Sequence, residues 1–112
     1  MIVNTTRVSV RPENRNEFLQ TVRPLLDPIR NEKGCMAYRV FVDATDENSS
    51  LLVGEWQTHE DWNHHIQSHG FEVLLGAVTV LGSPDCIEFR LLASVPLITK
   101  KIGDLILKSP VA

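Results

Sequence analysis

The sequence predicts an α+β fold, a ferredoxin-like β-α-β-β-α-β chain whose four strands form one antiparallel sheet. Two observations lead to this fold class. Apolar residues recur with a period of two in the segments assigned to strands, and at spacings of three and four in the segments between them. The segments follow one another as strand, helix, strand, strand, helix and strand, and the second helix falls into two parts.

The first strand is predicted over residues 2–11. Thr6, Val8 and Val10 alternate there with polar side chains, which is typical of a strand with one buried face. Pro12 ends the strand, because proline suits the first turn of a helix better than the interior of a sheet.

A helix is predicted over residues 13–31. Its apolar residues share one face: Phe18, Val22, Leu25, Leu26 and Ile29. Proline removes a backbone donor, so Pro24 and Pro28 predict a kink or break near residues 21–24. Gly34 is placed to end the segment.

The second and third strands are predicted over residues 35–43 and 51–56, joined by a polar hairpin loop over 43–50. Both strands are largely apolar on both faces. Helices cover only one face of such a sheet, so the other would leave a large apolar patch in a monomer. We therefore expect a homodimer that packs sheet to sheet.

The second helix is predicted in two parts, residues 59–67 and 71–81, separated by a break at Gly70. Thr58 can cap the first part, with Asp61 as the acid of a capping-box-like pair. The second part carries an apolar stripe at helical spacing.

A turn over residues 82–85 and a fourth strand over 86–94 complete the predicted domain, residues 1–94. Residues 95–112 form a C-terminal extension with a weak helical pattern. It is expected to be a short helix or an arm that reaches a partner chain.

The composition excludes several function classes. The chain has 112 residues and a net charge of −3, so it offers no basic footprint for nucleic acid. No apolar run is long enough to span a membrane and the N-terminus lacks a signal-peptide pattern, so we expect a cytoplasmic protein. Cys35 and Cys86 are expected to be buried thiols rather than a disulfide.

The histidines form the main polar cluster: His59, His64, His65 and His69. His65 and His69 stand four residues apart, a spacing that suits a metal on one helix face. No third strong ligand accompanies them, so we predict no metal site.

Three aromatic residues are open to two interpretations. Trp56 ends a strand beside the histidine-rich helix, so it can pack in the core or line a cavity. Trp62 is assigned more readily to packing. Tyr38 is either a core residue with one hydrogen bond or a donor in a pocket.

Several motifs together resemble the antibiotic biosynthesis monooxygenase (ABM) domain over residues 1–94. They are Ser9-Val10-Arg11-Pro12-Glu13 leading to Glu17-Phe18, Glu32-x-Gly34-Cys35-x-x-Tyr38, Glu55-Trp56 and His65-x-x-Ser68-x-x-Phe71. The resemblance implies a dimeric α+β barrel with a pocket between the sheet and its helices.

Residue by residue, the resemblance is partial. Trp56 matches the strand-end tryptophan of the anthrone oxygenases, but Leu52 stands where they have an asparagine. Leucines at 74–75 replace the histidine that haem-degrading members use after the aromatic matching Phe71. His65 matches a histidine frequent in the quinol-oxygenase and signal-processing branches.

The resemblance implies a small oxygenase that needs no cofactor and acts on a quinol-like or other electron-rich cyclic substrate. His65 is the expected general base, since imidazole titrates near neutral pH. Tyr38, Trp56 and Phe71 are the expected contacts for a small apolar or aromatic substrate. One alternative is a non-catalytic dimeric module that binds a small ligand or a partner protein, and another is an isomerase-like or cleavage enzyme on the same scaffold.

Overall fold

The computed structural model describes the backbone of residues 1–93 and their side chains apart from those of 83–87. The C-terminal extension, 95–112, and the thiol of Cys86 lie outside the described residues. The elements follow in this order: β1 (Ile2–Val10), the 3-10 helix η1 (Pro12–Asn14), α1 (Arg15–Arg30), β2 (Cys35–Val42), β3 (Ser49–Trp56), α2 (His59–Ile66), α3 (His69–Leu81) and β4 (Gly82–Leu92).

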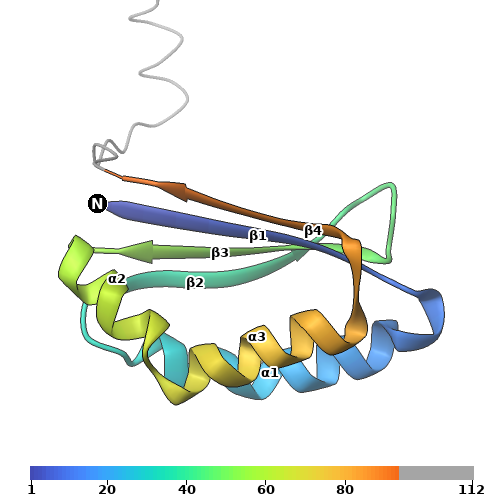
Figure 1. The fold of residues 1–112 in the computed structure, drawn as a ribbon, viewed down its shortest axis with the longest axis horizontal. Coiled ribbons are helices and arrows are strands. Elements are labelled where there is room, and N and C mark those ends of the chain that lie inside the picture. The colour runs from blue at the N-terminus through green and yellow to red at the C-terminus, as the bar shows by residue number, and fades with distance from the viewer. Residues whose placement is uncertain (94–112) are drawn as a thin grey trace, which may run out of the picture.

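The four strands form one sheet in the order β2-β3-β1-β4, and every neighbouring pair is antiparallel. Helices α1 and α3 lie side by side under one face of this sheet, and α2 lies at one end of it (Figure 1). The predicted α+β, ferredoxin-like order is confirmed, although β3 starts at Ser49, two residues before the predicted start at Leu51. None of the described helices is long and apolar enough to cross a membrane.

The core lies between the sheet and its two long helices. In β1 the alternation separates the faces: Ile2, Asn4, Val8 and Val10 are buried, whereas Arg7 is exposed. Because side chains alternate across a strand, one face of β1 contributes to the core and the other to the open surface. Asn4 is the polar member of the buried set.

Helix α1 is one continuous element, so a break near residues 21–24 is ruled out, while the alternative of a kink there stays a prediction. Its buried residues are Phe18, Val22 and Ile29. Pro24 and Pro28 lie inside the helix but are exposed. On the solvent side, water can satisfy the carbonyls that lose their helical partners, which allows the helix to continue.

Side-chain caps set the boundary between α2 and α3. The Thr58 hydroxyl accepts a hydrogen bond from the backbone N–H of Asp61 at 3.1 Å, as the capping prediction requires. The Ser68 hydroxyl accepts one from the N–H of Phe71 at 3.2 Å. The break therefore precedes Ser68, and the prediction of a break at Gly70 is wrong because Gly70 lies within α3.

The predicted turn over residues 82–85 is also wrong. Strand β4 begins directly after α3, and Gly82 pairs with Val10. The pairing shifts register between Val8 and Val10, so extra residues of β4 are accommodated in an irregularity of the ladder. Because β4 is an edge strand, it tolerates Pro84.

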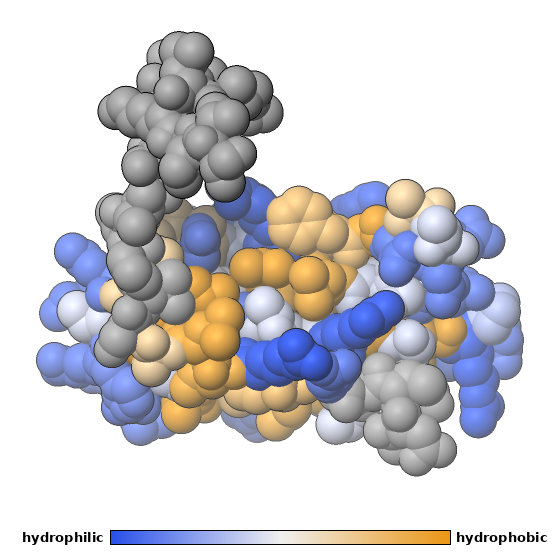
Figure 2. All heavy atoms as spheres, turned by 90° about the horizontal axis from the view of Figure 1, so that it is seen from above, coloured by the Kyte–Doolittle hydropathy of each residue, from blue (hydrophilic) through white to orange (hydrophobic). Residues whose placement is uncertain are grey.

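The face of the sheet away from the helices is mixed in character. The pairing aligns Phe41, Leu51, Arg7 and Glu88 in one row across it. Figure 2 shows apolar patches on this face with a hydrophilic band across its middle, and further hydrophilic residues towards its ends. The charged residues of this row come from β1 and β4, whereas those from β2 and β3 are apolar, and sheet-to-sheet dimerisation stays a prediction.

Candidate functional site

His65 is the buried histidine of α2. Its side chain is fully buried, and its Nδ1 lies 2.7 Å from Oε2 of Glu32. The neighbouring His64, on the same helix, is exposed. The face that α2 turns towards the sheet therefore carries one imidazole into the core and pairs it with a carboxylate from a distant part of the chain.

A tight turn after α1 holds Glu32 in place. The N–H of Cys35 donates to the carbonyl of Glu32 at 3.1 Å, and Gly34 adopts a left-handed backbone with φ of 77°. The N–H of Gln57 donates to the carbonyl of Gly34 at 2.8 Å, which ties the turn to the segment that leads into α2. The turn and the helix that bears His65 thus form one local unit.

Four aromatic side chains surround the His65 imidazole. The distances between ring centroids are 4.3 Å to Trp56, 5.3 Å to Phe71, 5.8 Å to Trp62 and 5.9 Å to Tyr38. Trp56 stacks on the imidazole at an interplanar angle of 25°, whereas Phe71 meets it edge to face at 73°. The structure therefore brings together all four residues that the sequence predicted for the site.

The second ring nitrogen of His65 has no hydrogen-bond partner. Nε2 is buried, and it is the one buried side-chain polar atom without a partner among the described residues. Burial lowers the pKa of His65 below its usual range, although the hydrogen bond and the charge of Glu32 act in the opposite direction. A neutral ring is consistent with both facts, because a protonated Nε2 would be a buried donor with nothing to bind.

A buried polar pair supports the aromatic cluster from the sheet. The indole N–H of Trp56 donates to Oδ1 of Asn4 at 3.0 Å. Burial raises the pKa of the Tyr38 hydroxyl above its usual range, while a hydrogen bond with Asn4 opposes the shift. Tyr38 is therefore neutral at ordinary pH, and Asn4 orients both aromatic residues.

An apolar cavity lies beside this cluster, between α3 and the sheet. Its volume is about 210 Å³. Its lining residues are Thr6, Phe71, Leu74, Leu75, Val78 and Phe89. Phe71 both lines the cavity and contacts His65. Trp62 also links the two regions, because it contacts His65 and stacks on Phe89 with a distance of 6.0 Å between the ring centroids.

The predicted site residues hold different places in this arrangement. Phe71 is the one that lines the cavity, whereas Tyr38, Trp56 and His65 lie in the core next to it. Whether these three contact a substrate stays a prediction. Sequence reasoning assigned no role to Glu32, although it stands in the Glu32-x-Gly34-Cys35 motif.

Asn4 was missed as well. A signal for it exists in the sequence, since Asn4 falls on the same alternating face of the first strand as Thr6, Val8 and Val10. A polar residue at an inward position requires a partner, which here is the indole of Trp56.

The possible metal ligands do not converge. His65 belongs to α2 and His69 to α3, so they do not share one helix face. Among the described residues, no group of three or more His, Cys, Asp or Glu side chains could hold a metal ion. Burial and the nearby charge of Glu32 raise the pKa of the Cys35 thiol, which disfavours a reactive thiolate.

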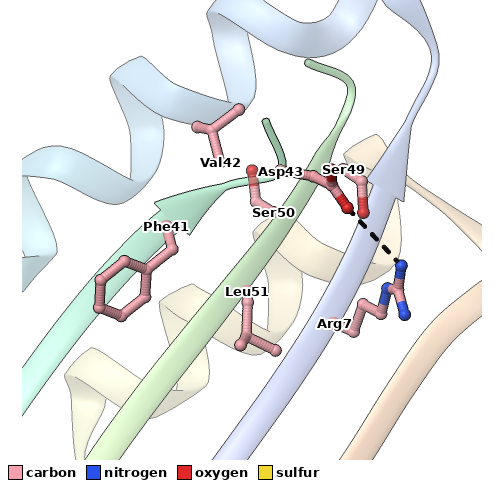
Figure 3. Close-up of a pocket in the computed structure, with 7 residues that line it drawn as sticks. All are labelled: Arg7, Phe41, Val42, Asp43, Ser49, Ser50 and Leu51. Carbon is pink, nitrogen blue, oxygen red and sulfur yellow. Dashed lines mark ion pairs between the residues drawn. The ribbon is translucent and has the colours of Figure 1, made fainter. Parts of the chain in front are cut away.

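A larger hollow of about 310 Å³ lies on the open face, at the end of the sheet where β2 and β3 meet their loop. Figure 3 shows its lining residues: Arg7, Phe41, Val42, Asp43, Ser49, Ser50 and Leu51. Arg7 and Asp43 form an exposed ion pair across it at 3.9 Å. The hollow does not share a lining residue with the cavity beside His65.

Comparisons with known proteins agree with the fold. Residues 1–77 match the family model described as antibiotic biosynthesis monooxygenase. An uncharacterised protein of Synechocystis is 30% identical over 70 residues, covering 62% of this chain and 48% of that protein, so the match spans about half of its length. The YcnE protein of Bacillus subtilis, provisionally named a monooxygenase, is 29% identical over 72 residues, covering 64% of this chain and 76% of that protein.

Solved structures show the same architecture. A crystal structure of an antibiotic biosynthesis monooxygenase superposes with a TM-score of 0.75 at 25% identity, covering 86% of this chain and all (100%) of the other. SnoaB from Streptomyces nogalater, a cofactor-independent oxygenase, superposes with a TM-score of 0.73 at 15% identity, covering 88% of this chain and 97% of its own. The likeness to SnoaB concerns the fold alone.

Proposed function

This chain belongs to the antibiotic biosynthesis monooxygenase family, and from that premise we propose that it is a small oxygenase that needs no cofactor. Its proposed substrate is a quinol-like or other electron-rich cyclic molecule. The observation that carries the proposal is the unpaired, buried Nε2 of His65 beside an apolar cavity. A substrate of this kind reduces dioxygen itself once it has lost a proton, so the protein must supply a base and a dry site.

In this proposal the cavity holds the substrate ring and His65 takes its proton. For an activated CH₂ group, oxidation by one dioxygen molecule to a carbonyl places one oxygen atom in the product and the other in water. Nε2 accepts the first proton, while the electron pair of the broken C–H bond stays on the substrate and is passed to dioxygen. Phe71 lines the cavity and contacts the imidazole, and in this proposal its rotation opens a path between them.

We further propose that the functional unit is a homodimer packed through the open sheet face. Phe41 and Leu51 are large, exposed apolar residues on that face, and a second copy would bury them. The charged neighbours in their row, Arg7 and Glu88, would then form the polar part of the interface.

The second candidate is a non-catalytic module that binds a small apolar ligand in the same cavity. Its support is the cavity lining, in which Thr6 is polar and the other five of the described residues are apolar. Such a wall can hold an apolar ring but offers little to orient a reaction. The two candidates differ in whether Nε2 of His65 is used.

Oxygen consumption with a panel of reduced quinols and anthrones tests the proposal. His65→Ala should lower turnover by about 10²–10⁴-fold, the usual contribution of a general base. His64→Ala is the matched control, since His64 neighbours His65 but is exposed, and it should leave the rate unchanged. Equal rates for wild type and His65→Ala would discard His65 as the base. A wild type that binds the compounds without consuming oxygen would support the binding module instead.

A further inference from the structure

We propose that Glu32 is a positioning residue, which holds the His65 imidazole with its proton on Nδ1 and leaves Nε2 free to accept a proton. This inference rests on the proposed function, in which His65 is the base. It adds a residue to that function, and it commits the site to one tautomer of the ring.

The short contact between the two side chains fixes where the proton lies. A carboxylate only accepts hydrogen bonds, so a neutral imidazole 2.7 Å from Oε2 of Glu32 must donate from Nδ1. Its lone pair then lies on Nε2, the buried atom that lacks a partner. A neutral imidazole free in water favours the opposite tautomer, so the protein has to select this one.

The position of Glu32 is set by the turn and not by its own side chain alone. A Cβ atom at Gly34 would lie 2.0 Å from Oδ2 of Asp61, so the turn packs directly against the first turn of α2. Asp61 is held in turn by Thr58, whose hydroxyl donates to Oδ2 at 2.9 Å. The carboxylate and the imidazole are therefore carried by two segments locked to each other, which preserves their distance.

The pair also suits the charged state that the reaction creates. When Nε2 accepts a proton, the ring becomes an imidazolium inside the aromatic cluster. The carboxylate of Glu32 is then its counter-ion at hydrogen-bond distance, and because that side chain is partly exposed, water continues to solvate its outer oxygen. In this role Glu32 positions and stabilises the base without exchanging a proton with the substrate.

Nitrogen-15 spectra of the histidine rings in the full chain test this inference without any substrate. In the wild type, the His65 signals should show a protonated Nδ1 and an unprotonated Nε2, identified by their loss in His65→Ala. Glu32→Ala should remove the preference for this tautomer. Glu32→Gln keeps the size of the side chain, so it guards against a failure of Glu32→Ala to fold. It should also reduce the preference, because an amide can either accept a hydrogen bond from Nδ1 or donate one to it. Glu60→Gln, an exposed substitution on α2, is the control and should change nothing.

Turnover supplies a second readout. With a substrate that the wild type oxidises, both Glu32 variants should lose at least about 10-fold in rate, while Glu60→Gln keeps it. An unchanged His65 tautomer in a folded Glu32 variant would overturn the positioning role, whatever the activity. If the His65 tautomer depends on Glu32 but the wild type consumes no oxygen, the positioning role is upheld and the oxygenase proposal is overturned. The two failures are therefore distinguishable.

Discussion

Gly34 and Asp61 are in such close contact that a Cβ atom at Gly34 would lie 2.0 Å from Oδ2 and 2.5 Å from Cβ of Asp61. Because the clash includes the Cβ atom, turning the carboxylate away would not relieve it, and the start of α2 would have to move. This contact is the joint between the turn that bears Glu32 and the helix that bears His65.

Gly34→Ala should therefore lower the free energy of unfolding by about 2–3 kcal/mol. The left-handed backbone at φ of 77° costs about 1–2 kcal/mol for a residue with a side chain, and loss of the Thr58–Asp61 hydrogen bond adds about 1 kcal/mol. Gly76→Ala is the control. Gly76 lies inside α3, where an added Cβ atom would meet no other atom within 4 Å outside its own stretch of helix, so the substitution should stabilise the protein by about 0.5–1 kcal/mol. Urea unfolding measures the free energy of unfolding of both variants. Equal changes in the two would contradict the close contact between Gly34 and Asp61.

Replacing Asn4 by valine should destabilise the protein by about 1–3 kcal/mol, because the indole N–H of Trp56 would be left buried without an acceptor. Trp56→Phe removes the donor. In a double-mutant cycle, the two changes together should cost less than the sum of the single changes, by about 0.5–3 kcal/mol. Strict additivity would mean that the hydrogen bond contributes nothing.

The stability of the protein should fall as the solution becomes acidic. Burial lowers the pKa of His65 in the folded state, whereas in the unfolded chain it is about 6.5. Between these two values the unfolded chain binds more protons, so the free energy of unfolding rises with pH. The contribution is complete above about pH 6.5 and is lost as the pH falls through the lowered pKa of the folded state.

Within the described part of the chain, the ionisable side chains that face the ring are Glu32, from the turn after α1, and Tyr38, from β2. Urea unfolding between about pH 5 and pH 8 should show this slope in the wild type and in His64→Ala, and a smaller slope in His65→Gln. Glu32→Gln removes the charge that raises the pKa of His65, so it should extend the slope to lower pH. The same slope with and without His65 would contradict the assignment.

Leu75→Trp should weaken the binding of an anthrone by about 10-fold or more, equal to about 1.4 kcal/mol. Leu75 lines the cavity but is half exposed, so the larger side chain can fill the opening with little effect on stability. Val80→Trp is on the same helix at a more exposed position away from the cavity, and it should bind as the wild type does. Fluorescence titration compares the variants, and equal affinities would place the ligand elsewhere.

Sedimentation should show a dimer at micromolar concentration. Leu51→Lys should dissociate it, because the substitution would place a charge in the apolar part of the proposed interface, next to Phe41 and Arg7. Val80→Lys on α3 should leave it intact. A wild type that is a folded monomer at this concentration would remove the sheet-to-sheet dimer.

The sequence by itself determined the order of the elements and the face that each one buries. Period-two and helical spacings record which side chains leave water, so β1 and α1 could be read from residues such as Val8 and Phe18. The capping role of the Thr58 hydroxyl could also be predicted from the sequence, since a cap is a local interaction. The prolines of α1 do not break the helix, because they lie on its exposed side, where water can bind the carbonyls left without a helical partner.

Only the tertiary structure decided the partners of the site. His65 and Glu32 are 33 residues apart, and Trp56 and Asn4 are 52 apart. These pairs form because two strands align in register and because Gly34 lets a turn approach α2. Such contacts produce no repeating pattern in the sequence, since each one involves a single residue from each of two distant segments. The sequence therefore identified the imidazole, while the fold supplied its carboxylate, its aromatic enclosure and its unpaired nitrogen.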